Sequence, residues 1–188
     1  MSVPARLQPL AETLALMLAV TLAGWLVGPA TVALTGAVLA RPWTFVTSVY
    51  AHGDLVHLCP TAIVVTLAGV PVALSTTRAR FHAFFLATGI VAGAAEVLTG
   101  AAGVIGASGA AFALVGYVVA ANPVAGVVAT RIDVSPRVGI AVVAAIALLV
   151  VVLFGGVGSA LLAHFVGAAV GLVAGRDRVL AVAGRTER

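Results

Sequence analysis

Residues 104–121, VIGASGAAFALVGYVVAA, form an apolar run of 18 positions without a charged side chain. About 20 apolar residues are enough to cross a lipid bilayer as a helix. Similar runs recur along the chain, and they are continuous and rich in Ala, Leu and Val, which favours helices over the alternating strands of a β-barrel. We therefore predict an all-α membrane protein with spans over residues 10–28, 57–75, 81–99, 104–121, 138–155 and 159–175.

The composition agrees with a single membrane domain over residues 1–188. The chain is 62% hydrophobic and 9% charged, and its mean hydropathy is +1.22, whereas about a quarter of the residues in a soluble domain are charged. All ten basic residues are arginines scattered between apolar runs, so there is no basic face for nucleic acid. The single Cys59 excludes a disulfide within the chain and a cysteine-built metal site.

The arginines also give the chain an orientation. With six spans, nine of the ten lie in segments on one side and Arg41 lies alone on the other. Because positive residues favour the cytoplasmic side, we expect both termini in the cytoplasm and a multi-pass protein of a prokaryotic plasma membrane. The nine are Arg6, Arg78, Arg80, Arg131, Arg137, Arg176, Arg178, Arg185 and Arg188.

Residues 29–56 form the longest connection on the outer side. This segment is itself half apolar, and it carries Trp43 and Tyr50. Both residue types prefer the boundary between lipid and water, so we expect the segment to lie partly in that interface.

Polar side chains inside the predicted spans are few, and each costs a few kcal/mol in lipid unless it is paired or used. His57, Ser108 and His164 each fall in the outer third of a span. The orientation rests on the arginines alone, so this shared depth is a separate observation. It predicts a polar cluster that opens to the outside.

Ser108 lies between glycines in the stretch Gly106-Ala-Ser-Gly109, at the start of a predicted span. The glycines allow close approach of another helix or of a substrate backbone. A helix N-terminus offers free N–H groups that suit a developing oxyanion. The pattern is compatible with a nucleophilic serine, although the motif taken alone is more often the small-residue packing that is common in membrane helices.

His164 is followed by Gly167, Gly171 and Gly175 at spacings that place all four residues on one face of a helix. A histidine on a close-packing face points into the helix bundle. There the imidazole can approach a serine hydroxyl as its general base. The alternative is a buried histidine that is satisfied by a backbone carbonyl.

These motifs resemble those of the rhomboid intramembrane serine proteases, over about residues 41–175. The resemblance implies that Ser108 is the nucleophile and His164 the general base of a dyad without a carboxylate. It also implies that His57 and residue 61 help the Ser108 N–H to hold the oxyanion, although Thr61 stands where the family has Asn. The matching stretches are Gly106-x-Ser108-Gly109, Ala163-His164-x-x-Gly167-x-x-x-Gly171, Trp43, His52 and His57.

The sequence offers no obvious carboxylate that would extend the dyad to a triad. Asp54, Asp133 and Asp177 are placed in loops, and Glu96 is on another helix without an evident link to His164. Phe112 lies one turn after Ser108, where the family usually has a tyrosine. Its ring is expected to stack on His164, to serve as an ordinary core side chain, or to do both.

We therefore expect a serine endopeptidase that cleaves transmembrane segments of membrane proteins, with the bilayer and such substrates as its partners and with neither cofactor nor metal. The four histidines do not form a zinc motif. The first alternative is a catalytically weak or inactive rhomboid-like pseudoprotease that binds membrane proteins. The second is a small transporter or channel, which would need charged or amide groups near the bilayer midplane.

Overall fold

The computed structural model describes residues 4–122 and 160–182, together with positions 138, 141, 144, 145 and 148. Within these residues the regular elements are all helical, as predicted, and a single isolated bridge pairs Leu34 with Val104. The α-helices are α1 (Gln8–Val27), α2 (Thr44–Tyr50), α3 (Leu55–Ser75), α4 (Arg78–Leu98), α5 (Ser108–Ala121) and α8 (Leu161–Arg176); two short 3₁₀ turns cover Ala5–Leu7 and Pro29–Thr31.

Five of the six predicted spans coincide with apolar helices. In the described part of the chain, three stretches are long and apolar enough to cross a membrane: Ala5–Val27, Leu55–Ser75 and Arg78–Leu98. Helices α5 and α8 are apolar but shorter, at 14 and 16 residues. The predicted span 138–155 lies almost entirely outside the described residues, so the count of six spans rests on the sequence.

The predicted span 104–121 is too long at its beginning. Helix α5 begins only at Ser108, because the four residues before it have another conformation. Val104 exchanges two backbone hydrogen bonds with Leu34, each of 2.9 Å. Gly106 then has a φ of +129°, which is unfavourable for residues with a side chain. Ser108 is therefore the first residue of its helix.

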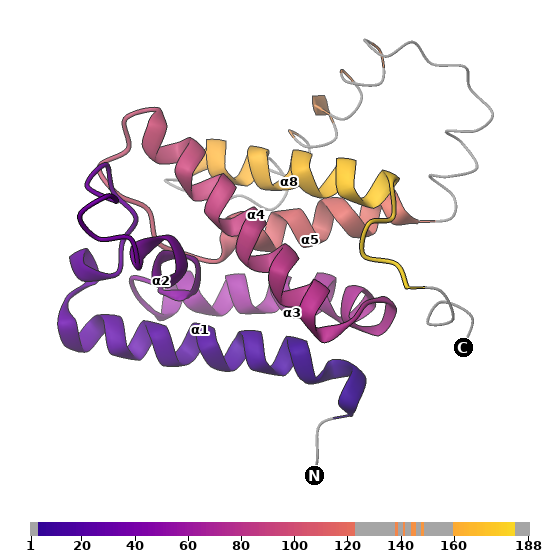
Figure 1. Cartoon of the computed structure of the whole chain (residues 1–188), viewed down its shortest axis with the longest axis horizontal. Helices are drawn as coiled ribbons and strands as arrows, with labels where there is room; N and C mark the ends of the chain where they lie inside the picture. Colours follow the sequence, from indigo (N-terminus) through magenta and orange to yellow (C-terminus); the bar gives the residue numbers. More distant parts are fainter. Residues whose placement is uncertain are drawn as a thin grey trace.

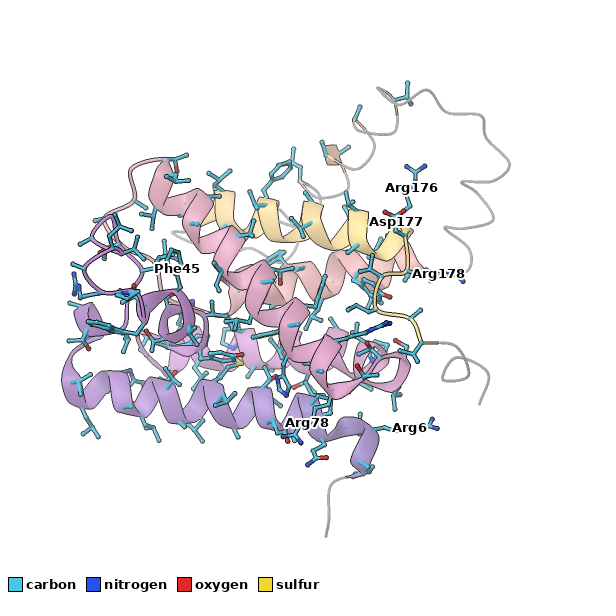
Figure 2. The ribbon with its side chains drawn as sticks, viewed as in Figure 1. Arg6, Phe45, Arg78, Arg176, Asp177 and Arg178 are labelled. Carbon is cyan, nitrogen blue, oxygen red and sulfur yellow. The ribbon has the colours of Figure 1, made fainter. Side chains whose placement is uncertain are left out.

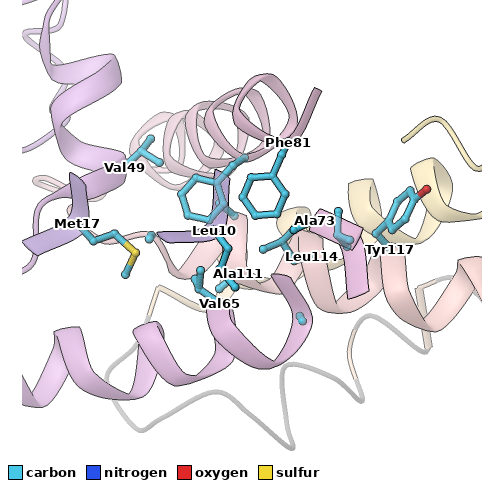
Figure 3. Close-up of a cluster of buried hydrophobic side chains, with 14 of the residues drawn as sticks. Leu10, Met17, Val49, Val65, Ala73, Phe81, Ala111, Leu114 and Tyr117 are labelled. Atoms are coloured by element: carbon cyan, nitrogen blue, oxygen red, sulfur yellow. The ribbon is translucent and has the colours of Figure 1, made fainter. Parts of the chain in front are cut away.

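The helices form one bundle (Figure 1). Helices α5 and α8 run side by side, and α4 crosses both of them. On its other side α5 packs against α3, and α3 packs against α1. The short helix α2 packs against α4 and α1. Figure 3 shows part of the apolar core, where Phe81, Leu114 and Val65 meet from α4, α5 and α3.

The glycines of α8 bring its backbone into contact with that of α5. A Cβ atom added at Gly167 would overlap the Gly109 carbonyl oxygen, and one added at Gly171 would overlap that of Ala113. The same holds for Gly175 and the Tyr117 carbonyl. The predicted close-packing face of this helix is thus confirmed, and its partner is the helix that begins at Ser108.

Four of the arginines and the aromatic Phe45 lie toward opposite ends of the bundle. Figure 2 shows Arg6, Arg78, Arg176 and Arg178 toward one end and Phe45 of α2 toward the other. Trp43 is 52% exposed, in agreement with an interfacial position. The expectation for Tyr50 was wrong: its side chain is buried and stacks on Phe85, with ring centroids 5.9 Å apart.

Candidate active site

The turn before Ser108 depends on Gly106. The Gly106 N–H donates to the Ser48 carbonyl at 2.8 Å, which ties the turn to α2. The positive φ of Gly106 requires a glycine, and a Cβ atom there would lie 2.8 Å from the His57 ring. Gly106 is therefore needed both for the backbone conformation and for the close approach of His57. The imidazole of His57 consequently lies against the turn that leads into Ser108.

Asp54 sets the position of His57. It is the N-cap of α3, and its Oδ1 accepts a hydrogen bond of 2.7 Å from the His57 N–H. A side-chain acceptor at this position satisfies one of the free N–H groups of the first helical turn. From the sequence we placed Asp54 only in a loop. The signal that identifies the cap is an aspartate directly before an apolar run.

The side chain of His52 holds the backbone of Ala107, the residue before Ser108. Its side chain is 1% exposed. Nδ1 lies 3.0 Å from the Tyr50 carbonyl oxygen, and Nε2 accepts the Ala107 N–H at 3.3 Å. A carbonyl oxygen can only accept, so Nδ1 carries the proton and the ring is neutral. Neutral His52 therefore fixes the backbone of Ala107.

The contact between Gly109 and Gly167 brings Ser108 and His164 into one neighbourhood. Ser108 directly precedes Gly109, and His164 lies one turn before Gly167 on α8. The Ala163 carbonyl oxygen is 3.6 Å from a Cβ atom built on Gly109, and Ala163 lines a small cavity together with Ser108 and Ser48. The first turns of α5 and α8 thus lie against each other.

Phe112 orients the imidazole of His164. The two rings stack with centroids 4.4 Å apart and planes inclined by 16°, which confirms the expected contact. His164 is 5% exposed, and its Nδ1 is buried without a hydrogen-bond partner in the described part of the chain. The Phe112 ring is therefore the contact shown to hold the orientation of the His164 imidazole in the described residues.

Thr61 lies on the same face of α3 as His57, as predicted, but its hydroxyl is engaged. Oγ1 donates a hydrogen bond of 2.9 Å to the His57 carbonyl, and the side chain is 7% exposed. A hydroxyl has only one proton to donate. In this conformation Thr61 therefore has no proton left for an oxyanion.

Trp43 lies away from these contacts. Its Nε1 donates to the Thr31 carbonyl at 3.0 Å, and Arg41 donates to the Ala30 carbonyl at 2.7 Å. These bonds hold the segment before α2 in place. Trp43 is thus a support of the segment before α2.

Glu96 has a link to His164 that sequence reasoning missed. Its Oε2 accepts a hydrogen bond of 2.8 Å from the N–H of Ala163, the residue before His164. The signal available in the sequence was a carboxylate near the end of an apolar run, which is expensive in lipid unless it is paired. Its partner is a backbone group on a helix far along the chain, so no side-chain motif marks it.

In the described part of the chain no hydrogen bond joins the Ser108 hydroxyl to the His164 ring. Catalytic hydrogen bonds are often long or absent without substrate and tighten in the complex. The arrangement nevertheless gathers a hydroxyl, an imidazole and a helix N-terminus, which are the groups that acyl transfer requires.

Acid should destabilise the protein through His52. Burial, aided by the nearby His57 and opposed by the Tyr50 carbonyl, lowers the pKa of His52 to about 4, against about 6.5 for an unperturbed histidine. Between these values the unfolded chain binds a proton that the folded chain excludes. The contribution of neutral His52 to the free energy of unfolding is therefore fully present above about pH 6.5. It is lost as the pH falls toward 4, by about 3 kcal/mol at most.

The measurement is the thermal midpoint of unfolding in detergent at pH 7.5 and 5.5. The control is His52→Gln, which keeps an acceptor for the Ala107 N–H but does not titrate. We expect a smaller acid-induced decrease in this variant than in the parent. Equal decreases would show that His52 is not the group responsible.

The Rhomboid domain family matches residues 39–178, which make up more than half of the chain and include α2 to α5 and α8. A comparison with curated proteins returns no match. The matched segment contains Ser108, His164 and the three other histidines, and its helices are apolar, as those of an integral membrane protein are. The chain is a member of the rhomboid family.

Proposed function

We propose that this protein is an intramembrane serine endopeptidase in which Ser108 is the nucleophile and His164 the general base. The observation that carries this proposal is the contact of Gly167 with the Gly109 carbonyl, which brings the first turn of α8 against Ser108. Family membership supports the same chemistry, because rhomboid proteins are typically intramembrane serine proteases. The substrates would be transmembrane segments of other membrane proteins.

The reaction would proceed in two stages of acyl transfer. Ser108 Oγ forms a bond to the scissile carbonyl carbon while His164 takes the hydroxyl proton. Nδ1 of His164 is buried, so Nε2 is the nitrogen that exchanges protons. The scissile C–N bond then breaks, and His164 gives the proton to the leaving amine. Water attacks the acyl-enzyme, His164 takes its proton, and Ser108 recovers the proton as the carboxylic acid leaves.

The oxyanion would be held by the backbone of Ser108 and by His57. Ser108 is the first residue of α5, so its N–H has no acceptor within the helix. The ring of His57 lies against Gly106, which is two residues before Ser108 in the chain. Thr61 is a weak candidate for a third donor, because its hydroxyl already donates to the His57 carbonyl.

A second candidate function is a pseudoprotease that binds membrane segments without cleaving them. The engaged hydroxyl of Thr61 is the observation that favours it. Ser108 and His164 lie in the first turns of two helices that pack against each other. The presence of both residues there favours cleavage, because binding alone requires neither of them. Cleavage assays distinguish the two functions.

The orientation that we propose places both termini in the cytoplasm and the site at the outer side. Nine of the ten arginines follow this arrangement. The turn before Ser108 is bonded to α2, which lies at the end of the bundle away from the labelled arginines in Figure 2. Water would then reach the dyad from outside the cell.

Ser108→Ala and His164→Ala should each abolish cleavage of a model transmembrane substrate while the protein stays folded. Residues that act as one catalytic unit are not additive, so the double variant should be no slower than either single variant. Turnover by purified protein in detergent is the measurement. Parent-like cleavage by Ser108→Ala would refute the assignment of the nucleophile.

Thr61→Asn should increase kcat by about ten-fold or more with little change in KM, since one well-placed oxyanion donor contributes about a hundred- to a thousand-fold. Thr61→Val, which has neither hydroxyl nor amide, should bring no gain. His57→Ala should lower kcat in the parent. If Thr61→Asn is neutral or harmful while His57→Ala remains slow, Thr61 already fills the donor position.

The orientation is tested with single cysteines in a Cys59→Ala background. Ala102 and Ala79 are both exposed, the first between α4 and α5 and the second between Arg78 and Arg80. In intact cells an impermeant thiol reagent should label Ala102→Cys, and it should label Ala79→Cys only after the membrane is permeabilised. The reverse pattern would place the dyad at the cytoplasmic face.

A further inference from the structure

Glu96 connects the last part of α4 to the first turn of α8. Its Oε2 accepts the Ala163 N–H at 2.8 Å. Ala163 is the third residue of α8, and His164 follows it directly. The His164 N–H makes an ordinary helical bond of 3.1 Å to the Ala160 carbonyl. The contact thus acts on the turn of backbone that carries the imidazole.

The first turn of α8 depends on this external acceptor. The first four N–H groups of a helix have no acceptor within it. The N-cap residue Ala160 makes no side-chain capping bond. A carboxylate near the N-terminus also interacts favourably with the positive end of the helix dipole. Glu96 therefore acts as the capping group of α8, although it belongs to another helix.

The face of α4 that carries Glu96 also contacts α5 at Gly109, the residue after Ser108. Ala92 lies one turn before Glu96, and a Cβ atom on Gly109 would lie 2.5 Å from the Ala92 Cβ. Helix α4 thus contacts α5 through Ala92 and α8 through Glu96. These two contacts fix the start of α8 relative to the residue that follows Ser108.

We propose that Glu96 is a positioning residue, which holds the first turn of α8 so that the His164 imidazole stays in register with Ser108. This inference rests on the proposed function. The carboxylate bonds to the Ala163 N–H, whereas His164 Nδ1 has no hydrogen-bond partner in the described part of the chain. Glu96 therefore acts through the backbone and does not replace the carboxylate of a triad.

The test compares Glu96→Ala, Glu96→Gln and Leu98→Ala in cleavage of a model transmembrane substrate. Glutamine keeps an oxygen acceptor at the same reach, and alanine removes it. Leu98 is 86% exposed at the end of α4 and serves as the control for loosening of that helix. Misplacement of a catalytic group by about 1 Å costs about a hundred-fold, so we expect Glu96→Ala to lose about ten- to a hundred-fold in kcat.

Three further results are expected. The KM of Glu96→Ala should stay within about two-fold of the parent, Glu96→Gln should recover most of the lost kcat, and Leu98→Ala should match the parent. A parent-like kcat in Glu96→Ala would overturn the proposal. So would a loss in Glu96→Gln as large as that in Glu96→Ala, since the acceptor would then not be the decisive feature.

Two further cases are a Glu96→Ala variant that does not fold and a parent protein that does not cleave. If Glu96→Ala does not fold, Glu96→Asp replaces it; this side chain is too short to reach Ala163, and an unchanged kcat would overturn the proposal. If the parent protein does not cleave, the proposed function fails. The thermal midpoint then tests the contact itself, and equal midpoints for Glu96→Ala and Glu96→Gln would overturn it.

Discussion

The contact between the backbones of α5 and α8 is the constraint on which the rest of the site depends. Lipid supplies no hydrophobic force between helices, so their association requires close packing of small residues. Gly167 meets the Gly109 carbonyl, Gly171 that of Ala113, and Gly175 that of Tyr117. Because Ser108 and His164 lie at the beginning of this seam, the packing that holds the two helices together also brings the two residues of the proposed dyad near each other.

Each residue of the proposed dyad is preceded by an alanine whose N–H is held by a distant side chain. Nε2 of His52 accepts from Ala107, before Ser108, and Oε2 of Glu96 accepts from Ala163, before His164. The stack of Phe112 then orients the imidazole ring. The two side chains of the proposed dyad are thus positioned through backbone hydrogen bonds and ring packing, and in the described residues no carboxylate contacts the histidine.

The sequence predicts features that depend on periodicity and misses those that depend on distant backbone groups. The glycine face of α8 and the stack of Phe112 on His164 both follow from helical spacing. The bond from Glu96 to Ala163 joins residues of two helices, and its backbone donor has no residue-type signature. The start of α5 was placed four residues early, because hydropathy does not register the positive φ of Gly106. Tyr50 is buried because it meets Phe85 of α4, a pairing that no local pattern predicts.

In the proposed function the glycine contact makes Ser108 reactive by bringing His164 to it. The most direct measurement is the rate at which a fluorophosphonate forms a covalent adduct on Ser108, located by mass spectrometry, in the parent and in Gly167→Val. Valine at this position would collide with the Gly109 carbonyl and separate the two helices, although both dyad residues are still present. We expect an adduct on Ser108 in the parent and a labelling rate at least about ten-fold lower in Gly167→Val. An unlabelled parent, or equal rates in the two proteins, would contradict it.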